Sequence, residues 1–326
     1  VRRIGGREYA IVYNGEIYNV DELKPQLKAA GYRFGTATDT EVILYAYIEY
    51  GAAFVSGLNG IFAFAIWDGH KQQLLLYRDR LGVKPLFYTC RDDMLIFGSE
   101  IKALFNHPLV VPEVTMDSFR EIFGLGPART PGCGVFKDIF EVLPGHYQVF
   151  SNDGLREQRY WRLVAREHTE TYDQTVETVA FLVRDAITRQ LVSDVPVCCF
   201  LSGGVDSSIV TAVAADFLGR SGGRLNTFSF DFKDNVTFFR ANAFQPERDR
   251  PFVDVMLGSY DVNHTYLECN EEELVNLLDE VVDAKDLPGM ADVDASLLYF
   301  CSLVAKQNKV ALTGECADEI FCGYPW

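Results

Sequence analysis

Several features are missing from this 326-residue sequence, and each absence excludes a class of protein. No uninterrupted apolar run approaches ~18 residues, the length that a membrane-spanning helix needs, so we expect no membrane segment. Basic residues are few: 30 Lys and Arg stand against 46 Asp and Glu, giving a formal net charge of −16. Because an acidic surface repels phosphate backbones, general binding of nucleic acids is not expected.

Metal-binding patterns are also missing. The five histidines and eight cysteines form neither an H-E-x-x-H nor a C-x-x-C pattern, so we expect no zinc site. In a chain of this length, the cysteines are interpreted as reduced thiols of a cytoplasmic protein. Adjacent Cys198 and Cys199 are expected to point to opposite sides of one strand.

The sequence does not begin with methionine, and no signal peptide is expected in its opening residues. It opens at Val1, with "VRRIGGREYAIVYNGE" typical of the middle of a domain, and closes abruptly at Trp326. We therefore expect a piece of a longer protein, lacking both ends.

The first half of the chain, to about Trp161, is rich in short strands that end at Gly, Asn or Asp. Asn14-Gly15 ends the alternating stretch "REYAIVYNG" and predicts a turn. Amphipathic helices are predicted over 20–31 and 39–51, and a hairpin through 152–154. Strands and helices in this mixture indicate an α+β layer domain.

A different rhythm begins near Tyr172, after the polar linker Arg162–Thr171. Apolar residues at helical spacing predict a helix over 172–192. Strands then alternate with helices, which is typical of a parallel sheet with crossover helices. The expected strands cover 195–201, 224–232, 263–269 and 309–314, and the further helices begin at 206 or cover 248–260, 271–283 and 295–307.

Between the first strand and helix of this second half lies "SGGVDSS", Ser202–Ser208. Gly203 and Gly204 permit unusual backbone conformations and close approach of a ligand. The following helix directs its free N–H groups at the loop, and the serines add hydroxyl donors, so the loop is predicted to hold phosphate. A Walker A loop would require a lysine here. Asp206 instead predicts a divalent cation, Mg²⁺, between carboxylate and phosphates.

These residues resemble known families. "SGGVDSS" resembles the PP-loop of the ATP pyrophosphatases, and "ALTGECADEIFCGYPW", Ala311–Trp326, resembles the second motif of asparagine synthetases. "YNGEIYN", "TATDTEVIL", "GIFAFAIWD", "YRDRLGVKPLFY" and "GSEIKAL" resemble their glutamine amidotransferase domain. The chain is therefore identified as a member of the glutamine-hydrolysing asparagine synthetases.

The resemblance implies a fold and a reaction. Residues 1–163 would form an α+β amidotransferase domain of the N-terminal-nucleophile type, truncated, with stacked sheets between helices. Residues 172–326 would form an α/β PP-loop domain with a parallel sheet, lacking its C-terminus. The implied ligase converts aspartate to asparagine through β-aspartyl-AMP, using ATP, Mg²⁺ and ammonia from glutamine, and releases AMP and pyrophosphate. A homodimer is left open.

The resemblance also assigns roles to residues. Glu315 would face the acyl-adenylate and the incoming ammonia, and Asp206 and Asp318 would bind the metal. Asn14 and Gly15 would form an oxyanion hole, and Glu16 and Asp39 would grip the α-ammonium of glutamine. The residues implied to bind ATP and pyrophosphate are Leu201, Ser202, Gly203, Gly204, Val205, Asp206, Ser207, Ser208, Phe230, Thr313 and Gly314.

The sequence departs from the family pattern at three places. The family's nucleophile is an N-terminal cysteine, but no cysteine precedes Cys90, so the chain as given is not expected to hydrolyse glutamine. Cys316 and Cys322 replace glycines, and Cys322 is expected in a turn shaped for glycine. Three alternatives stay open: a β-lactam-forming synthetase, another PP-loop ligase, or an inactive pseudoenzyme.

Overall fold

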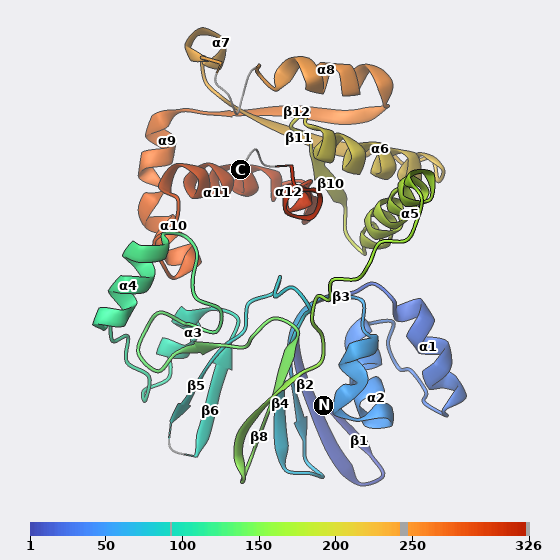
Figure 1. The fold of residues 1–326 in the computed structure, drawn as a ribbon, viewed down its shortest axis with the longest axis vertical. Coiled ribbons are helices and arrows are strands. Elements are labelled where there is room, and N and C mark those ends of the chain that lie inside the picture. Colours follow the sequence, from blue (N-terminus) through green and yellow to red (C-terminus); the bar gives the residue numbers. More distant parts are fainter. Residues whose placement is uncertain (92, 242–246, 324–326) are drawn as a thin grey trace. The chain divides into compact units, whose positions relative to one another are not determined.

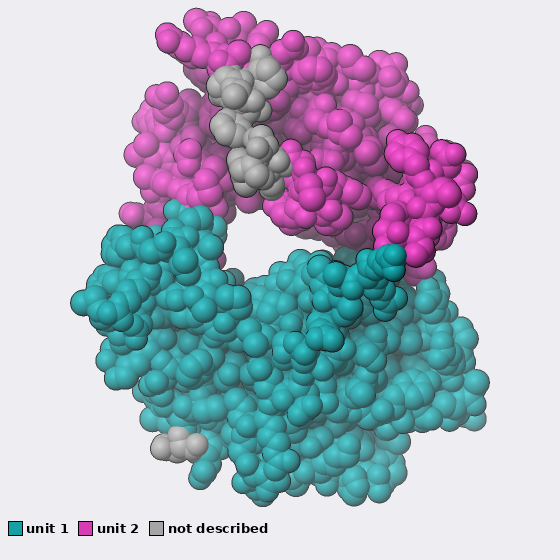
Figure 2. Space-filling model, in the orientation of Figure 1, with its two compact units in different colours: residues 1–167, 285–289 teal, residues 168–284, 290–326 magenta. Residues whose placement is uncertain are grey.

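The computed structural model describes residues 1–91, 93–241 and 247–323. The chain divides into two compact units, which Figure 2 shows in different colours. Unit 1 comprises residues 1–167 and 285–289, and unit 2 comprises residues 168–284 and 290–326. Figure 1 traces the elements of each unit along the chain. No helix in the described ranges is long and apolar enough to cross a membrane.

Unit 1 contains two antiparallel sheets. The larger has the order β1-β2-β3-β4-β8-β9, and the smaller has the order β6-β5-β7. The strands of the larger sheet are β1 Arg2–Ile4, β2 Arg7–Ile17, β3 Gly60–Asp68, β4 Gln73–Arg78, β8 His146–Ser151 and β9 Gly154–Arg159. Those of the smaller sheet are β5 Phe87–Arg91, β6 Met94–Gly98 and β7 Phe140–Glu141.

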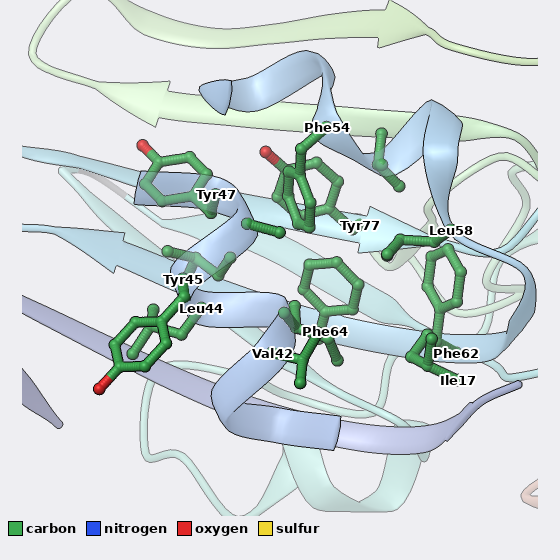
Figure 3. Close-up of a cluster of buried hydrophobic side chains, with 14 of the residues drawn as sticks. Ile17, Val42, Leu44, Tyr45, Tyr47, Phe54, Leu58, Phe62, Phe64 and Tyr77 are labelled. Atoms are coloured by element: carbon green, nitrogen blue, oxygen red, sulfur yellow. The ribbon is translucent and has the colours of Figure 1, made fainter. Parts of the chain in front are cut away.

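Alternation along β3 explains how unit 1 forms layers. Phe62 and Phe64 point to one face and pack with helix α2, Asp39–Tyr50, and the 3₁₀ helix η1, Ala52–Gly57 (Figure 3). Helix α1, Val20–Ala29, closes this layer. Complete burial of such a phenyl ring contributes about 1.5–3 kcal/mol.

The opposite face of β3 meets the smaller sheet. Ala63 and Ala65 pack with Tyr88 of β5 and Phe97 of β6. The far side of β5 carries Phe87, which packs against helix α3, Ile101–Phe105. Unit 1 is therefore a pair of stacked sheets between helices, and the predicted fold class of this half is confirmed.

Two expectations for unit 1 need correction or addition. The turn predicted at Asn14-Gly15 is wrong, because β2 continues to Ile17 and pairs Asn14 with Ala63 of β3. Helix α4, Met116–Leu125, is an addition to the predicted elements, and a capping box between Thr115 and Ser118 closes its N-terminus.

Unit 2 is built on a parallel sheet of order β12-β11-β10-β13, as predicted. Cys199 of β10 packs with helices α5, α6 and α8, whereas its neighbour Cys198 packs with α11 on the opposite face. The prediction that these two thiols point apart is confirmed. The strands are β10 Val197–Phe200, β11 Leu225–Phe232, β12 Val262–Cys269 and β13 Val310–Leu312.

The helices of unit 2 are α5 Tyr172–Gln190, α6 Val205–Gly219, α7 Asn235–Phe238, α8 Arg250–Ser259, α9 Glu271–Asn276, α10 Leu278–Lys285, α11 Ala291–Val304 and α12 Ala317–Phe321. The single helix predicted over 271–283 is wrong, since α9 ends before Leu277 and α10 begins after it. The apolar stripe of α5 is only partly covered: Ile187 is buried, but Val176 and Leu182 are exposed.

Candidate functional sites in the two units

The loop Ser202–Gly204 lies at the carboxyl end of β10 and leads directly into α6. Ser207, in the first turn of α6, fixes it from within. The Ser207 hydroxyl lies 3.0 Å from the Ser202 hydroxyl, accepts from the Ser202 N–H at 3.2 Å and donates to the Gly204 carbonyl at 3.1 Å. Val205 and Ser208 complete the predicted set at the start of α6, and the Val205 side chain is exposed. A free helix N-terminus beside ordered hydroxyls is suited to binding an anion.

The two glycines of this loop have different roles. Gly203 has φ +83°, and a Cβ there would lie 2.7 Å from Cβ of Phe252 and 2.9 Å from N of Val253. Gly203 therefore allows the loop to lie against the first turn of α8. A Cβ on Gly204 would meet only Ser202 Oγ, at 3.5 Å, so this position tolerates a side chain.

The second motif meets the first at Gly314. A Cβ on Gly314 would lie 2.7 Å from N of Ser207 and 2.9 Å from C of Asp206, so only glycine allows this approach. The neighbouring Thr313 accepts a hydrogen bond from the Glu315 N–H at 3.3 Å, and the Glu315 side chain is exposed. Segments more than 100 residues apart thus come together at the start of α6.

Asp206 and Asp318 are the carboxylates implied to bind a metal. Asp206 belongs to the first turn of α6, where Gly314 approaches, and Asp318 to the first turn of α12. Within the described ranges, no group of three or more His, Cys, Asp or Glu side chains could hold a metal ion by itself. Mg²⁺ is commonly held by one or two carboxylates together with substrate phosphates, so the number of carboxylates is compatible with this ion.

The expectation about Cys322 is confirmed. Cys322 has φ 57° and ψ 44°, and Cys316 has φ 70°, so both occupy the left-handed region that favours glycine. They flank the five-residue helix α12. The last three residues of this motif, 324–326, lie outside the described residues.

A hollow beside the loop lies at the ends of β11 and β12 and the start of α8; we call it the strand-end hollow. Its lining residues are Ser202, Ser229, Phe230, Asp231, Asn235, Asp249, Arg250, Val253 and Tyr266. The ring of Phe230 stacks on Phe300 at 4.2 Å, so its side chain belongs to the core. The carbonyl of Leu201 accepts a hydrogen bond from the Ser229 hydroxyl.

In unit 1, the implied glutamine-binding residues gather at the end of β2. Asp39, at the start of α2, accepts from the Tyr13 hydroxyl at 2.6 Å and from the Ile17 N–H at 3.2 Å. Asn14 and Glu16 lie between these two donors in sequence, on the exposed side of the strand. The Asn14 amide donates to the Ser99 hydroxyl at 3.2 Å. Burial and then the Asp39 carboxylate raise the pKa of Tyr13, so its hydroxyl remains a donor.

Gly15 lies in the same strand because it has no side chain. Its φ is +155°, and a Cβ would lie 2.2 Å from the Ile61 carbonyl oxygen of β3. The Asn-Gly pair therefore marks a close approach of two strands, which explains why the turn interpretation fails.

Glu41 organises the segment that precedes Asp39. Burial alone would raise the pKa of Glu41, but hydrogen bonds from Gly35, Thr36 and Tyr45 outweigh it and hold the pKa at about 2. The carboxylate accepts from the Gly35 N–H at 3.1 Å and from the Thr36 hydroxyl at 2.7 Å. Glu41 therefore fixes the loop that leads into α2.

Sequence reasoning missed several residues of these sites. Tyr13 and Ser99 lie within the motifs "YNGEIYN" and "GSEIKAL", which could have drawn attention to them. Asp231 and Tyr266 belong to no recognisable motif. Only the parallel pairing of β11 with β12 brings them toward the same edge of the sheet.

Comparison with known proteins covers both units. A model of the glutamine amidotransferase domain matches residues 5–161, and a model of asparagine synthase matches residues 178–326. The chain is 51% identical over 322 residues to glutamine-hydrolyzing asparagine synthetase 3 of Bacillus subtilis (strain 168), covering 98% of this chain and 52% of that protein. It is 34% identical over 318 residues to asparagine synthetase 1 of the same organism, covering 97% and 48%.

The chain thus spans about half the length of the curated relatives that it matches. One similar solved structure is glutamine phosphoribosylpyrophosphate amidotransferase from B. subtilis, complexed with ADP and GMP. The match covers 82% of this chain and 63% of the chain of that enzyme. The TM-score of this match is 0.36, and the sequence identity is 15%.

Proposed function

The chain belongs to the glutamine-hydrolysing asparagine synthetases, and from this premise we propose that it carries both parts of an ATP-dependent amide ligase. Residues 172–326 would activate aspartate, and residues 1–163 would bind glutamine as the source of ammonia. The overall reaction would convert aspartate, ATP, glutamine and water into asparagine, AMP, pyrophosphate and glutamate.

The contact between Gly314 and the start of α6 is the observation that best supports the activation step. It places Gly314 against Asp206 and Ser207, and from this we infer that the segment from Thr313 to Asp318 belongs to the same site as the phosphate-binding loop. A nucleotide, a metal ion and an acyl group require this combination of partners in one place.

In the proposed step, an oxygen of the aspartate side chain attacks the α-phosphorus of ATP. The bond to the β-phosphate oxygen breaks, which yields β-aspartyl-AMP and pyrophosphate. Negative charge grows on the departing pyrophosphate. The hydroxyls and backbone N–H groups of Ser202–Ser208 would stabilise it, and one such fixed donor typically contributes about 3–4 kcal/mol.

Mg²⁺ would be held by Asp206 and Asp318 together with the phosphates, and when bound it neutralises charge on the phosphate oxygens. Glu315 would face the acyl-adenylate. Ammonia would then attack the acyl carbon, AMP would leave, and the Glu315 carboxylate would accept the surplus proton. The backbones of Leu201 and Phe230 would flank the adenosine, and Thr313 and Gly314 would approach the nucleotide.

For unit 1 the proposal concerns glutamine binding. The Glu16 and Asp39 carboxylates would hold the α-ammonium of glutamine, with Asp39 positioned by Tyr13 and Ile17. The Asn14 amide and the Gly15 N–H would donate to the oxyanion formed at the side-chain amide. The cysteine nucleophile of the family has no counterpart before Cys90 in these residues.

The test is pyrophosphate release by the complete gene product, measured with ATP, MgCl₂ and ammonium chloride. We expect release to require aspartate and to fall at least about 100-fold in Asp206→Asn. Asp216→Asn is the matched control, because Asp216 is an exposed residue of the same helix, α6. Release that does not depend on aspartate, or full activity of Asp206→Asn, would contradict the proposal.

A further inference from the structure

The strand-end hollow adjoins the phosphate-binding loop at Ser202 and continues along the end of β11. Its polar side chains include the carboxylates Asp231 and Asp249 and the guanidinium of Arg250. None of these residues received a role from the sequence motifs. The hollow is therefore a candidate for the part of a nucleotide that lies beyond its phosphates.

Two hydrogen bonds fix the carboxylate of Asp231 through one of its oxygens, and the other oxygen can accept a further hydrogen bond. Its Oδ1 accepts from the Phe232 N–H at 2.8 Å and from the Asn235 side-chain amide at 2.6 Å. Within the described ranges, its Oδ2 has no hydrogen-bond partner. Since Asn235 holds the orientation, the second oxygen is presented as a single, directed acceptor.

The charges of the hollow favour an uncharged donor as its occupant. The Arg250 guanidinium lies 4.1 Å above the ring of Tyr266 and 3.9 Å from the Glu268 carboxylate. Arg250 is thus shared with Glu268, a further acid that does not line the hollow. A phosphate would be repelled here, whereas an amino group or a hydroxyl group would find an acceptor in Asp231.

The position of Asp231 selects the base of the nucleotide rather than its sugar. The pairing of β10 with β11 ends at Phe200 and Phe228, and Asp231 lies three residues further, about 10 Å along the strand. With phosphates over the loop, the ribose stays close to them because it is bonded to the α-phosphate. The base extends further out and is the part that can reach Asp231.

We propose that Asp231 selects adenine by accepting a hydrogen bond from its 6-amino group, an inference that rests on the proposed ATP-dependent function. Adenine presents a donor at this position, whereas guanine and hypoxanthine present an oxygen acceptor. A carboxylate oxygen facing that acceptor has no proton to share. Adenine nucleotides are therefore preferred over 6-oxopurine nucleotides.

The test is calorimetric binding of ATP, ITP and 2′-deoxy-ATP to the complete gene product with MgCl₂. The Asp231→Asn variant keeps an oxygen for Phe232 and Asn235 but offers an N–H in place of the free oxygen. Asp234→Asn is the control, because it removes the same charge from a neighbour outside the hollow. Unfolding in urea checks that each variant is folded.

We expect the wild type and Asp234→Asn to bind ATP about tenfold or more tighter than ITP, and Asp231→Asn to lose this preference. An unchanged ratio of ATP to ITP affinity in folded Asp231→Asn would overturn the inference. So would a variant that changes only the discrimination between ATP and 2′-deoxy-ATP, because the contact would then be to the sugar. A wild type that binds no nucleotide would instead refute the proposed function itself.

Discussion

Replacing Gly314 by alanine tests whether the two motifs of unit 2 share one site. The added methyl would lie 2.7 Å from N of Ser207 and 2.9 Å from both C and Cβ of Asp206. Backbone atoms cannot move aside cheaply, so the turn around Gly314 must withdraw from the start of α6. Overpacking of this kind costs about 1–3 kcal/mol.

If this cost falls on the bound state, the affinity for ATP decreases about 5- to 150-fold, since each 1.4 kcal/mol corresponds to a factor of ten. The Gly219→Ala variant is the matched control. Gly219 ends the same helix, α6, and a Cβ there would have no atom within 4 Å. We expect wild-type affinity from Gly219→Ala and weak binding from Gly314→Ala, measured by calorimetry with MgCl₂.

Unfolding in urea must accompany the binding measurement, because a variant that fails to fold also fails to bind. The informative case is a folded Gly314→Ala protein. If it binds ATP as tightly as Gly219→Ala does, the approach of Gly314 to Ser207 has no part in nucleotide binding. The argument that joins the two motifs into one site would then be refuted.

Three further substitutions test other parts of the structure. The pKa of Glu41 is about 2 instead of 4.5, so its carboxylate contributes about 3 kcal/mol to the free energy of unfolding above pH 5, and this contribution is lost as the pH falls to 2. Urea unfolding of Glu41→Gln should lack this pH dependence. An equal pH dependence in wild type and variant would contradict the role of Glu41. Cys322→Gly should raise the free energy of unfolding by about 1 kcal/mol in the same assay, because Cys322 has φ 57°; a decrease would argue against left-handed strain. Gly15→Ala should lower the free energy of unfolding by about 3 kcal/mol, because the methyl would lie 2.2 Å from the Ile61 carbonyl oxygen. Gly57→Ala is the control and should not lower it, because a Cβ on Gly57 has open space around it. Equal stabilities of these two variants would count against the strand pairing.

Periodic apolar patterns predicted the layers of both units. The alternation of β3 and the parallel strands of unit 2 follow from local spacing, which needs no knowledge of the partner segment. Helix α4 was not predicted, although it has a capping box and its apolar residues recur at helical spacing. The turn predicted at Asn14-Gly15 is wrong because the local turn preference of these residues contains no information on the close approach of β3.

The candidate sites divide in the same way. The loop Ser202–Ser208 could be predicted because one short segment carries the glycines, the hydroxyls and the helix start. The contact of Gly314 with Asp206 does not follow from local patterns, since it depends on how β13 pairs with β10; only the family resemblance indicated that both motifs serve one site. Asp231 shows the same limit, because its role rests on strand ends that only the folded sheet brings together.

A crystal structure of the chain with ATP and MgCl₂ tests the central claim most directly. We predict that the β- and γ-phosphates lie over Ser202–Ser208, with Asp206 and Asp318 on the side of the metal ion. Phosphates bound anywhere else on unit 2, with this loop left free, would contradict the account.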